Sequence, residues 1–317
     1  MSTTDATEYD IAVIGGGIAG LTAGLFGARY GRSTLVLESV VPGGHLNNIE
    51  KIEDFPGFPE GLAGYDLCPT VHEQAERAGA QFALAEVERV KSAAGDHPIW
   101  HVVTSQGTYT CRAVIVASGT RPAPLGVPGE IDLYGRGISH CASCDGPLYA
   151  GKVVGVVGGH DDAIQEALTL AAFAERVIVF NPSGVLPGQE TYRRRAHAQP
   201  KIEVRHNMAV VEILGEASKV AAVRVRDLTS GVEAQVDLAG VFIYAGYQPN
   251  TAFMRDHLPL KADGRIPTDT WMRTAQPGLF AAGDVRHDSP RHAITSAGEG
   301  ATAAVAAHRY IESLAGR

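Results

Sequence analysis

Two cysteines separated by two residues offer the clearest chemistry in this chain. Cys141 and Cys144 lie in the stretch GISHCASCDGP at residues 137–147. Such a pair can close a small disulfide and exchange it with another thiol pair, and one of its thiolates is usually acidified enough to act as a nucleophile near neutral pH. Asp145 follows directly and adds a carboxylate that can move the proton released or taken up when the disulfide opens. The stretch therefore predicts thiol–disulfide redox chemistry.

A zinc half-site is the alternative interpretation of a C-x-x-C pair. A structural zinc ion would need a second pair of ligands at similar spacing. The two other cysteines, Cys68 and Cys111, are isolated in the sequence, and this favours the redox interpretation. We predict that Cys68 and Cys111 are small core residues, because free cysteines are commonly buried.

Length and composition indicate a globular protein. The chain has 317 residues, enough for two domains with separate cores, and 45% of them are hydrophobic. A net charge of -8 argues against nucleic acid as a general partner. No apolar run approaches the ~20 residues of a membrane span, and the polar, acidic N-terminus is unlike a secretion signal. We therefore expect a cytoplasmic α/β enzyme whose C-x-x-C pair is catalytic rather than structural.

The first part of the chain contains a dinucleotide-binding pattern. A β-prone run, YDIAVI at residues 9–14, leads directly into GGGIAG, and a predicted helix follows. In this G-x-G-x-x-G setting Gly15 permits a tight turn, Gly17 lets the backbone approach a pyrophosphate and Gly20 allows close helix–strand packing. The next predicted strand ends in Glu38, a carboxylate that can bind ribose hydroxyls and disfavours a 2′-phosphate. The site is predicted to hold FAD or NAD rather than NADP.

Further segments resemble one family. GGGIAG, PGGHL, IEDFPGF, VIVASG, CASCDG and AAGD together resemble the low-molecular-weight thioredoxin reductases and the reductase module of alkyl hydroperoxide reductase flavoproteins, over about residues 9–311. The resemblance implies FAD at the first site, a thioredoxin or thioredoxin-like partner, and a homodimer. It also implies that Cys144 is the sulfur on the flavin side, that Cys141 attacks a partner disulfide, and that Asp145 is the acid–base.

The same resemblance implies which residues bind FAD. They come from the first glycine loop, the end of the second strand, the PGGHL and DFPG loops, the VIVASG strand and the C-terminal AAGD and RHA segments. The expected residues are Gly15, Gly17, Ile18, Ala19, Gly20, Glu38, Gly43, Gly44, His45, Leu46, Asn48, Asp54, Val87, Ala117, Ser118, Gly119, Gly283, Asp284, Arg291, His292 and Ala293.

Three of these positions depart from the family pattern. His45 and His292 occur where the family usually has Gln, and Asp54 occurs where it usually has Asn. In the family these positions lie near the flavin, so the tuning of the flavin is expected to differ in this chain.

A second strand–loop–helix pattern follows the C-x-x-C stretch. A predicted strand at residues 152–157 leads into GGHDDA, and a helix is expected to run to Ala174. The resemblance implies an NADPH site here, bound through GGG-x-x-A and an HRR-x-x-x-R stretch. In this chain His160 replaces the third glycine, and Asp161 and Asp162 put negative charge where a phosphate would bind.

The residues expected to select a nucleotide are also altered. Asn181 lies as far after Gly158 as Glu38 lies after Gly15, so it stands where the second site would have its ribose-binding acid. Residues 180–188 contain no arginine. The arginines of residues 192–195 could reach a phosphate, but such a charge run is usually a solvated helix face. NADPH, NADH or neither remains open as the electron donor, and the second loop is predicted to be a degenerate nucleotide site.

The predicted fold is α/β with two Rossmann-like nucleotide-binding domains, the second inserted in the first. The FAD domain is expected at residues 1–118 and 245–317, and the inserted domain, which carries the C-x-x-C pair, at residues 119–244. The segments PAPLGVP and GYQPN are expected to mark the crossings between them.

The predicted function is electron exchange between FAD, the Cys141–Cys144 disulfide and a thioredoxin-like partner. One alternative is an NAD(P)H-independent oxidase that runs the same chemistry backwards on a small or protein dithiol. A second is a variant with another electron donor or a second cofactor in the inserted domain. A third is a flavin-bound interaction protein without turnover, for which Cys144→Ser would leave the function intact.

Overall fold

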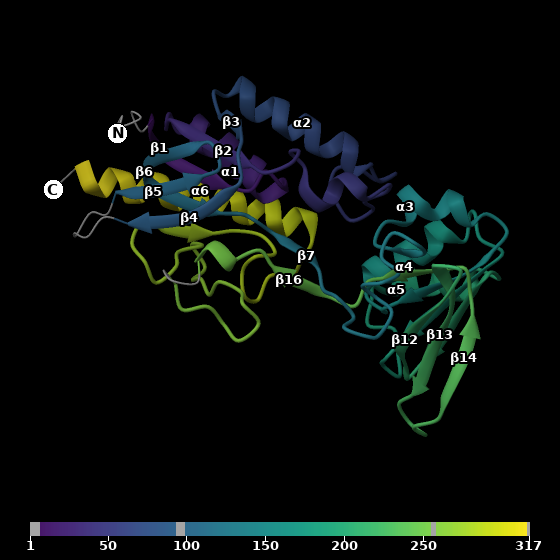
Figure 1. The fold of residues 1–317 in the computed structure, drawn as a ribbon. Helices are drawn as coiled ribbons and strands as arrows, with labels where there is room; N and C mark the ends of the chain where they lie inside the picture. Colours follow the sequence, from purple (N-terminus) through teal and green to yellow (C-terminus); the bar gives the residue numbers. More distant parts are fainter. Residues whose placement is uncertain (1–6, 93–98, 255–257, 316–317) are drawn as a thin grey trace. The chain divides into compact units, whose positions relative to one another are not determined.

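The computed structural model describes residues 7–92, 99–254 and 258–315 (Figure 1). The chain forms two compact units. The first comprises the described residues up to Arg121 and those from Gln248 onward, and the second is Pro122–Tyr247. Each unit is built on a parallel β-sheet that helices cover, so the chain has the predicted α/β architecture with one Rossmann-like unit inserted in the other.

The sheet of the first unit has seven strands in the order β3-β2-β1-β6-β5-β4, and β17 also pairs with β6. Strands β1, β2, β3, β6 and β17 are parallel, whereas β4 and β5 are antiparallel to their neighbours. Parallel strands end at the same edge of a sheet, so the loops after β1, β2, β6 and β17 converge there. The strands are β1 (Thr7–Ile14), β2 (Thr34–Glu38), β3 (Gln81–Leu84), β4 (Val87–Ser92), β5 (Trp100–Thr104), β6 (Gly107–Val116) and β17 (Leu279–Ala281).

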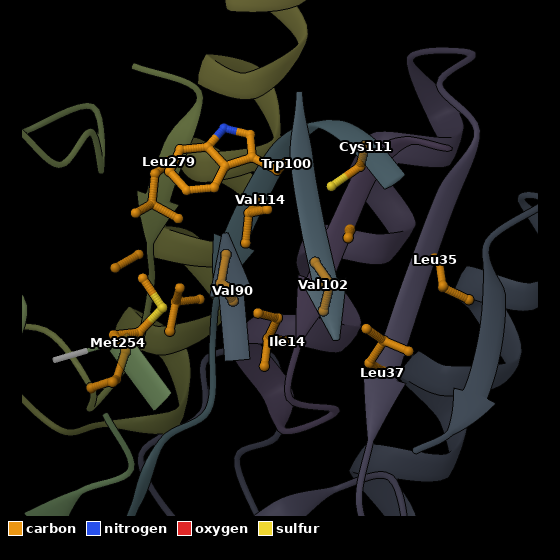
Figure 2. Packing of buried hydrophobic residues seen from close by; sticks show 14 of the residues in the cluster. Ile14, Leu35, Leu37, Val90, Trp100, Val102, Cys111, Val114, Met254 and Leu279 are labelled. Atoms are coloured by element: carbon orange, nitrogen blue, oxygen red, sulfur yellow. The ribbon is translucent and has the colours of Figure 1, made fainter. Parts of the chain in front are cut away.

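The two faces of this sheet are buried by different partners because side chains alternate along each strand. On one face Ile11 and Val13 of β1 pack with residues of helices α1 (Ile18–Arg29) and α6 (Ala293–Ala315). On the other face Ala12 and Ile14 belong to a cluster with Trp100, Val102 and Met254 (Figure 2). The remaining helical elements of this unit are η1 (Gly44–Asn48), α2 (Gly64–Arg77) and η3 (Ala252–Met254).

Small residues let α6 approach α1 closely. Ala303, Ala304 and Ala307 of α6 are fully buried. A Cβ on Gly300 would lie 2.1 Å from the carbonyl oxygen of Ala19 on α1, so only glycine fits at that crossing. The alanine-rich composition of residues 294–314 predicts a long closing helix, which is α6 (Ala293–Ala315), and its smallest side chains bring it against the helix that follows the first glycine loop.

The second unit has a five-stranded parallel sheet in the order β11-β10-β9-β15-β8 and a three-stranded antiparallel sheet, β12-β13-β14. One face of the parallel sheet packs on α4 (Asp161–Leu170), and the opposite face packs on the antiparallel sheet. The other elements are β8 (Ile138–Ser139), α3 (Ala142–Asp145), η2 (Gly146–Tyr149), β9 (Val153–Val157), β10 (Arg176–Asn181), α5 (Glu190–Ala198), β11 (Ile202–His206), β12 (Met208–Glu216), β13 (Lys219–Asp227), β14 (Glu233–Asp237) and β15 (Gly240–Ile243).

Two short strands carry the chain between the units. β7 (Thr120–Pro122) and β16 (Tyr247–Pro249) pair with each other as a two-stranded sheet. The Asn250 side chain donates to the carbonyl oxygen of Ser118 at 3.0 Å, and the Ser118 hydroxyl donates to the carbonyl oxygen of Asn250 at 2.7 Å. The outgoing and returning segments are therefore tied together side by side.

The helices and strands lie where the sequence patterns predict them, but some of their ends differ from the predicted ends by a few residues. Helix α1 begins at Ile18, three residues before the predicted start, because the glycine loop enters the helix directly. Helix α4 ends at Leu170 rather than at Ala174, and the chain turns before β10. Alternating runs at residues 220–226 and 234–238, on either side of Thr229, Ser230 and Gly231, predict a hairpin, which is present as the antiparallel β13–β14 pair. In the described part of the chain no helix is both long and apolar enough to cross a membrane.

Candidate flavin and disulfide sites

The first glycine loop is tightly packed inside and open outside. Gly15 has φ +104°, and a Cβ there would lie 2.4 Å from the carbonyl oxygen of Ala117. A Cβ on Gly20 would lie 1.8 Å from the carbonyl oxygen of Gly15, so the start of α1 is pressed against the loop. A Cβ on Gly17, the N-cap of α1, would meet nothing within 4 Å. The loop thus leaves space at the helix start, where backbone can approach a pyrophosphate.

Glu38 is held at the end of β2 beside this loop. Its Oε2 accepts a hydrogen bond from the backbone N–H of Gly16 at 2.7 Å. Its Oε1 accepts from the backbone N–H groups of Ser39 at 2.7 Å and Val40 at 3.1 Å. A carboxylate has about four acceptor positions, so one fixed in this way still accepts hydrogen bonds from ribose hydroxyls.

The PGGHL segment lies against the same loop. The backbone N–H of Gly43 donates to the carbonyl oxygen of Gly16 at 2.7 Å, and Gly17 and Gly43 form a parallel bridge. Gly44 begins η1, which contains His45, Leu46 and Asn48. Leu46 packs on the cluster of Ile18, Ile52 and Leu67. The structure therefore brings this predicted cofactor segment next to the first loop.

The AAGD turn follows β17 at the same sheet edge as the first glycine loop, and α6 holds it there. A Cβ on Gly283 would lie 3.0 Å from the Cβ of Ala19. The backbone N–H of Gly283 donates to Oε2 of Glu299 at 2.7 Å. Glu299 also forms an ion pair with Arg286. Burial raises the pKa of the next residue, Asp284, while its hydrogen bond from Ser296 and the charges of His45 and Arg291 act in the opposite direction. Asp284 is thus a partly buried acceptor beside the glycine loop.

Two of the residues that depart from the family pattern contact each other. Nδ1 of His292 lies 2.9 Å from Oδ2 of Asp54, and the two residues are 238 positions apart in sequence. His292 immediately precedes Ala293, the first residue of α6, and its carbonyl oxygen accepts from the backbone N–H of Ser296. This pair fastens the DFPG loop to the start of α6.

The remaining predicted cofactor residues lie at strand ends. Ala117, Ser118 and Gly119 follow β6, and the backbone N–H of Asn250 donates to Gly119. Val87 begins β4 and packs against the core cluster shown in Figure 2. Apart from Val87, the predicted residues lie in or beside the loops after β1, β2, β6 and β17, which share one sheet edge. Direct contact of each residue with FAD stays a prediction.

The C-x-x-C pair forms a disulfide at the start of a short helix. Cys141 and Cys144 are bonded, with 5.3 Å between their Cα atoms, and Cys141 is the N-cap of α3. The backbone N–H of Cys144 lies 3.2 Å from Sγ of Cys141, and the N–H of Cys141 donates to Oγ of Ser139 at 3.0 Å. Cys144 is exposed. Burial raises the pKa of Tyr149, and the charge of nearby Asp145 raises it further. The arrangement holds both sulfurs in one turn, and Asp145 follows Cys144 directly.

The two other cysteines are free thiols in the core, as predicted. Cys68 and Cys111 are each 1% exposed. Burial raises the pKa of Cys68 to about 11 and that of Cys111 to about 12. Both thiols are therefore protonated at neutral pH and do not compete with the C-x-x-C pair in disulfide exchange.

The second glycine loop repeats the backbone of the first. Gly158 has φ +137°, and a Cβ there would lie 2.4 Å from the carbonyl oxygen of Tyr244. His160 is the N-cap of α4, with φ −77° and ψ 178°. The loop therefore has the shape of a nucleotide loop, with an exposed imidazole where the first loop has a bare glycine.

The outer side of this loop is covered by the chain itself. Asp161 accepts hydrogen bonds from the backbone N–H and the side-chain amide of Gln189, and the carboxylate of Asp162 accepts from the N–H of Ala163. A Cβ on Gly159 would lie 3.3 Å from Cδ of Pro187. Two carboxylates thus lie at the start of α4 and the segment before α5 packs beside the loop, so negative charge opposes a pyrophosphate there.

The arginines that follow have partners of their own. Arg193 and Arg194 both pair with Glu190 on the exposed side of α5, and Arg195 lies 5.8 Å from the ring centre of Tyr192. This agrees with the interpretation of the run as a helix face. Asn181 donates to the carbonyl oxygens of Ser183 and Val185 and orders the loop after β10.

One residue near the disulfide escaped the sequence analysis. Glu166 is 6% exposed, and its Oε2 accepts from the backbone N–H of Ala142, between the two cysteines. A signal was available: Glu166 lies on the apolar face of α4 with Ala163, Ala167 and Leu170, where a carboxylate requires a specific partner.

Known proteins match nearly the whole chain. The family model described as pyridine nucleotide-disulphide oxidoreductase matches residues 9–300. The thioredoxin reductase of Treponema pallidum is 37% identical over 308 residues, which cover 97% of this chain and 99% of the relative. The bifunctional thioredoxin reductase/thioredoxin of Mycobacterium leprae is 38% identical over all of this chain and 69% of its own length. The crystal structure of Lactococcus lactis thioredoxin reductase superposes with a TM-score of 0.93 at 35% identity, covering 96% of this chain and 99% of that one.

The chain belongs to the low-molecular-weight thioredoxin reductases. The predicted family, fold class and enzyme class are thereby confirmed. This thioredoxin reductase homologue is a flavin-dependent thiol–disulfide oxidoreductase, and its cofactor is FAD. The open first loop, Glu38 and the partly buried Asp284 fit that cofactor, whereas the second loop carries two carboxylates that oppose a phosphate.

Proposed function

We propose that this enzyme transfers two electrons from FAD through the Cys141–Cys144 disulfide to the disulfide of a thioredoxin-like protein, and that NADPH does not deliver electrons through the second glycine loop. The observation that carries the second part is the closure of that loop by Asp161 and Gln189. The first part rests on the disulfide with its exposed Cys144.

Each residue of the disulfide site has a role that follows from its position. Bound FAD would supply the two electrons once a reductant other than a nicotinamide nucleotide had reduced it. Reduction breaks the Sγ–Sγ bond and leaves two thiols, and the thiolate of Cys141 attacks one sulfur of the partner disulfide to form a mixed disulfide. The thiolate of Cys144 then attacks Sγ of Cys141, which re-forms the internal disulfide and releases the partner as a dithiol. Asp145, directly after Cys144, holds and passes on the protons that accompany these two electrons.

The proposed partner is a thioredoxin-like protein because of the relatives. The Mycobacterium leprae relative carries both names, thioredoxin reductase and thioredoxin, in one chain. The proposed compartment is a reducing cytoplasm, because Cys68 and Cys111 are free thiols and the disulfide that forms is an exchangeable C-x-x-C pair. A homodimer is proposed from the family resemblance and is checked by the mass of the protein in solution.

Anaerobic titration of the purified holoenzyme tests the proposal. We expect no loss of the visible flavin absorbance with NADPH or NADH, and full loss with a reduced thioredoxin or dithiothreitol. The Cys144→Ser variant, which cannot form the internal disulfide, should not be reduced by the dithiols. Rapid bleaching by one nucleotide would overturn the donor assignment, and dithiol reduction that survives in Cys144→Ser would overturn the disulfide route. A flavin-bound interaction protein without turnover predicts instead that Cys144→Ser leaves its function intact.

Flavin release from the same sample counts the cofactor. We expect one FAD per chain, bound at the first loop. A ratio of two would place a second flavin in the inserted unit and make that cofactor the electron carrier that replaces NADPH.

An oxidase is the second candidate function, and the same closed loop favours it. A substrate dithiol would reduce the Cys141–Cys144 disulfide, and two electrons and two protons would pass through the flavin to oxygen, giving hydrogen peroxide. Oxygen consumption during steady dithiol oxidation would support this direction of electron flow. Reduction of a thioredoxin disulfide by the photoreduced enzyme would support the reductase direction.

A further inference from the structure

A buried carboxylate lies directly behind the C-x-x-C turn. Glu166 of α4 is 6% exposed, and its Oε2 accepts from the backbone N–H of Ala142 at 2.7 Å. The same oxygen accepts from the hydroxyl of Tyr244 at 2.9 Å. Ala142 is fully buried and is the residue that follows Cys141, so the turn that holds both sulfurs is bonded to this carboxylate.

The network links the disulfide to the second glycine loop. Tyr244 follows β15, and its carbonyl oxygen is the atom that a Cβ on Gly158 would meet at 2.4 Å. The hydroxyl of Tyr244 donates to Glu166, which also accepts from the N–H of Ala142 in the C-x-x-C turn. Burial and the charge of Glu166 raise the pKa of Tyr244, so the phenol keeps its proton and remains a donor.

The groups around this network are mostly acids and phenols. Asp162 and Tyr247 also raise the pKa of Tyr244, and Asp145 lies on α3 at the end of the C-x-x-C turn. On the other side of the turn, Nδ1 of His140 lies 2.8 Å from the carbonyl oxygen of Ile243. Glu166 is the acid bonded to the turn itself, in apolar surroundings that strengthen electrostatic interactions.

We infer that Glu166 is a positioning residue that fixes the C-x-x-C turn through Ala142 and whose charge sets the reduction potential of the disulfide. Reduction breaks the Sγ–Sγ bond, takes up two electrons and two protons from flavin or a dithiol, and gives two thiols. Cys141 must then lose its proton to become the attacking thiolate. A carboxylate fixed behind the turn opposes a second negative charge on that sulfur, so it raises the pKa of the thiol and disfavours the thiolate form of the reduced pair.

This has a consequence for catalysis. A thiolate of higher pKa is the stronger nucleophile, and a less stable reduced form gives up its electrons more readily. The charge of Glu166 therefore makes the reduced pair a better electron donor to a partner disulfide. The inference rests on the proposed disulfide exchange and is independent of which donor reduces the flavin.

The decisive variant is Glu166→Gln in the holoenzyme, because Gln keeps an oxygen for the N–H of Ala142 and removes the charge. At equilibrium with a fixed mixture of oxidised and reduced dithiothreitol, the ratio of reduced to oxidised enzyme should be about threefold to tenfold higher in this variant than in the unmodified enzyme. In a Cys144→Ser background the pH of half-maximal alkylation of Cys141 should fall by about one unit. Glu175→Gln, which removes an exposed acid of the same unit, should change neither value.

Two results would overturn the inference. One is an unchanged equilibrium and an unchanged alkylation profile in Glu166→Gln. The other is a defect confined to Glu166→Ala, which lacks the acceptor as well as the charge, since that outcome assigns Glu166 a purely structural role. If no variant, nor the unmodified enzyme, exchanged its disulfide with dithiothreitol, the proposed function itself would fail.

Discussion

The two glycine loops have nearly the same backbone but differ in what lies outside it. The first glycine of each loop, Gly15 or Gly158, has a positive φ. A Cβ on it would lie 2.4 Å from a carbonyl oxygen of the residue that follows a neighbouring strand, Ala117 after β6 or Tyr244 after β15. Gly17 and His160, the third residues, are both helix N-caps, with φ −68° and −77° and the same ψ of 178°. The strand–loop–helix unit is thus preserved in both places.

The difference lies on the ligand side. Beside Gly17 a Cβ would find open space, and Glu38 approaches from the next strand. Around Gly159 the chain folds back, with Pro187 against the loop and Gln189 bonded to Asp161. The comparison teaches that the same strand–loop–helix backbone can carry different outer surfaces, because the backbone is required to close the sheet and helix of each unit.

The largest effect is expected from Gly15→Ala, with Gly158→Ala as its matched partner. Each puts a methyl group at positive φ and 2.4 Å from a carbonyl oxygen, so each should lower the free energy of unfolding by about 2–4 kcal/mol. Only Gly15→Ala should lose FAD, measured as flavin per chain after desalting. If Gly158→Ala released FAD to the same extent, the two loops would not act independently.

A smaller effect is expected from Gly17→Ala. The φ of −68° suits alanine and its Cβ meets nothing within 4 Å, so the unfolding free energy of the apoprotein should stay unchanged. The methyl group occupies the space reserved for the pyrophosphate, and FAD should bind at least tenfold more weakly, roughly 1.4 kcal/mol. Titration of the apoprotein with FAD measures this, and an unaltered dissociation constant would contradict the open-loop assignment.

The smallest effect is expected from restoring the second loop with His160→Gly, Asp161→Asn and Asp162→Asn together. Two carboxylates at the start of α4 are removed, which should strengthen NADPH binding by about tenfold in calorimetric titration. Asp132→Asn, an exposed acid elsewhere in the unit, is the control and should have no effect. No gain in the triple variant would show that the covering segment around Pro187, rather than charge, excludes the nucleotide.

Much of the fold could be predicted from local pattern. The run YDIAVI followed by GGGIAG predicts β1 and α1, because strand propensity, glycine spacing and helix start all occur within twenty residues. The hairpin β13–β14 follows from a different local pattern, two alternating runs on either side of Thr229, Ser230 and Gly231. The end of α4 was placed too late, since its last apolar residues continue the helical pattern through the turn that leads to β10.

By itself, the sequence determined the chemistry: two cysteines with an adjacent aspartate, one complete glycine loop and one altered one. Only the tertiary structure decided what surrounds them. Glu166 reaches Ala142 across 24 positions, Gln189 reaches Asp161 across 28, and His292 reaches Asp54 across 238. Such contacts depend on which elements the sheets bring together, and no spacing in the sequence encodes them. Burial has the same origin, because whether a carboxylate is solvated or held against a disulfide depends on the packed neighbours of its helix.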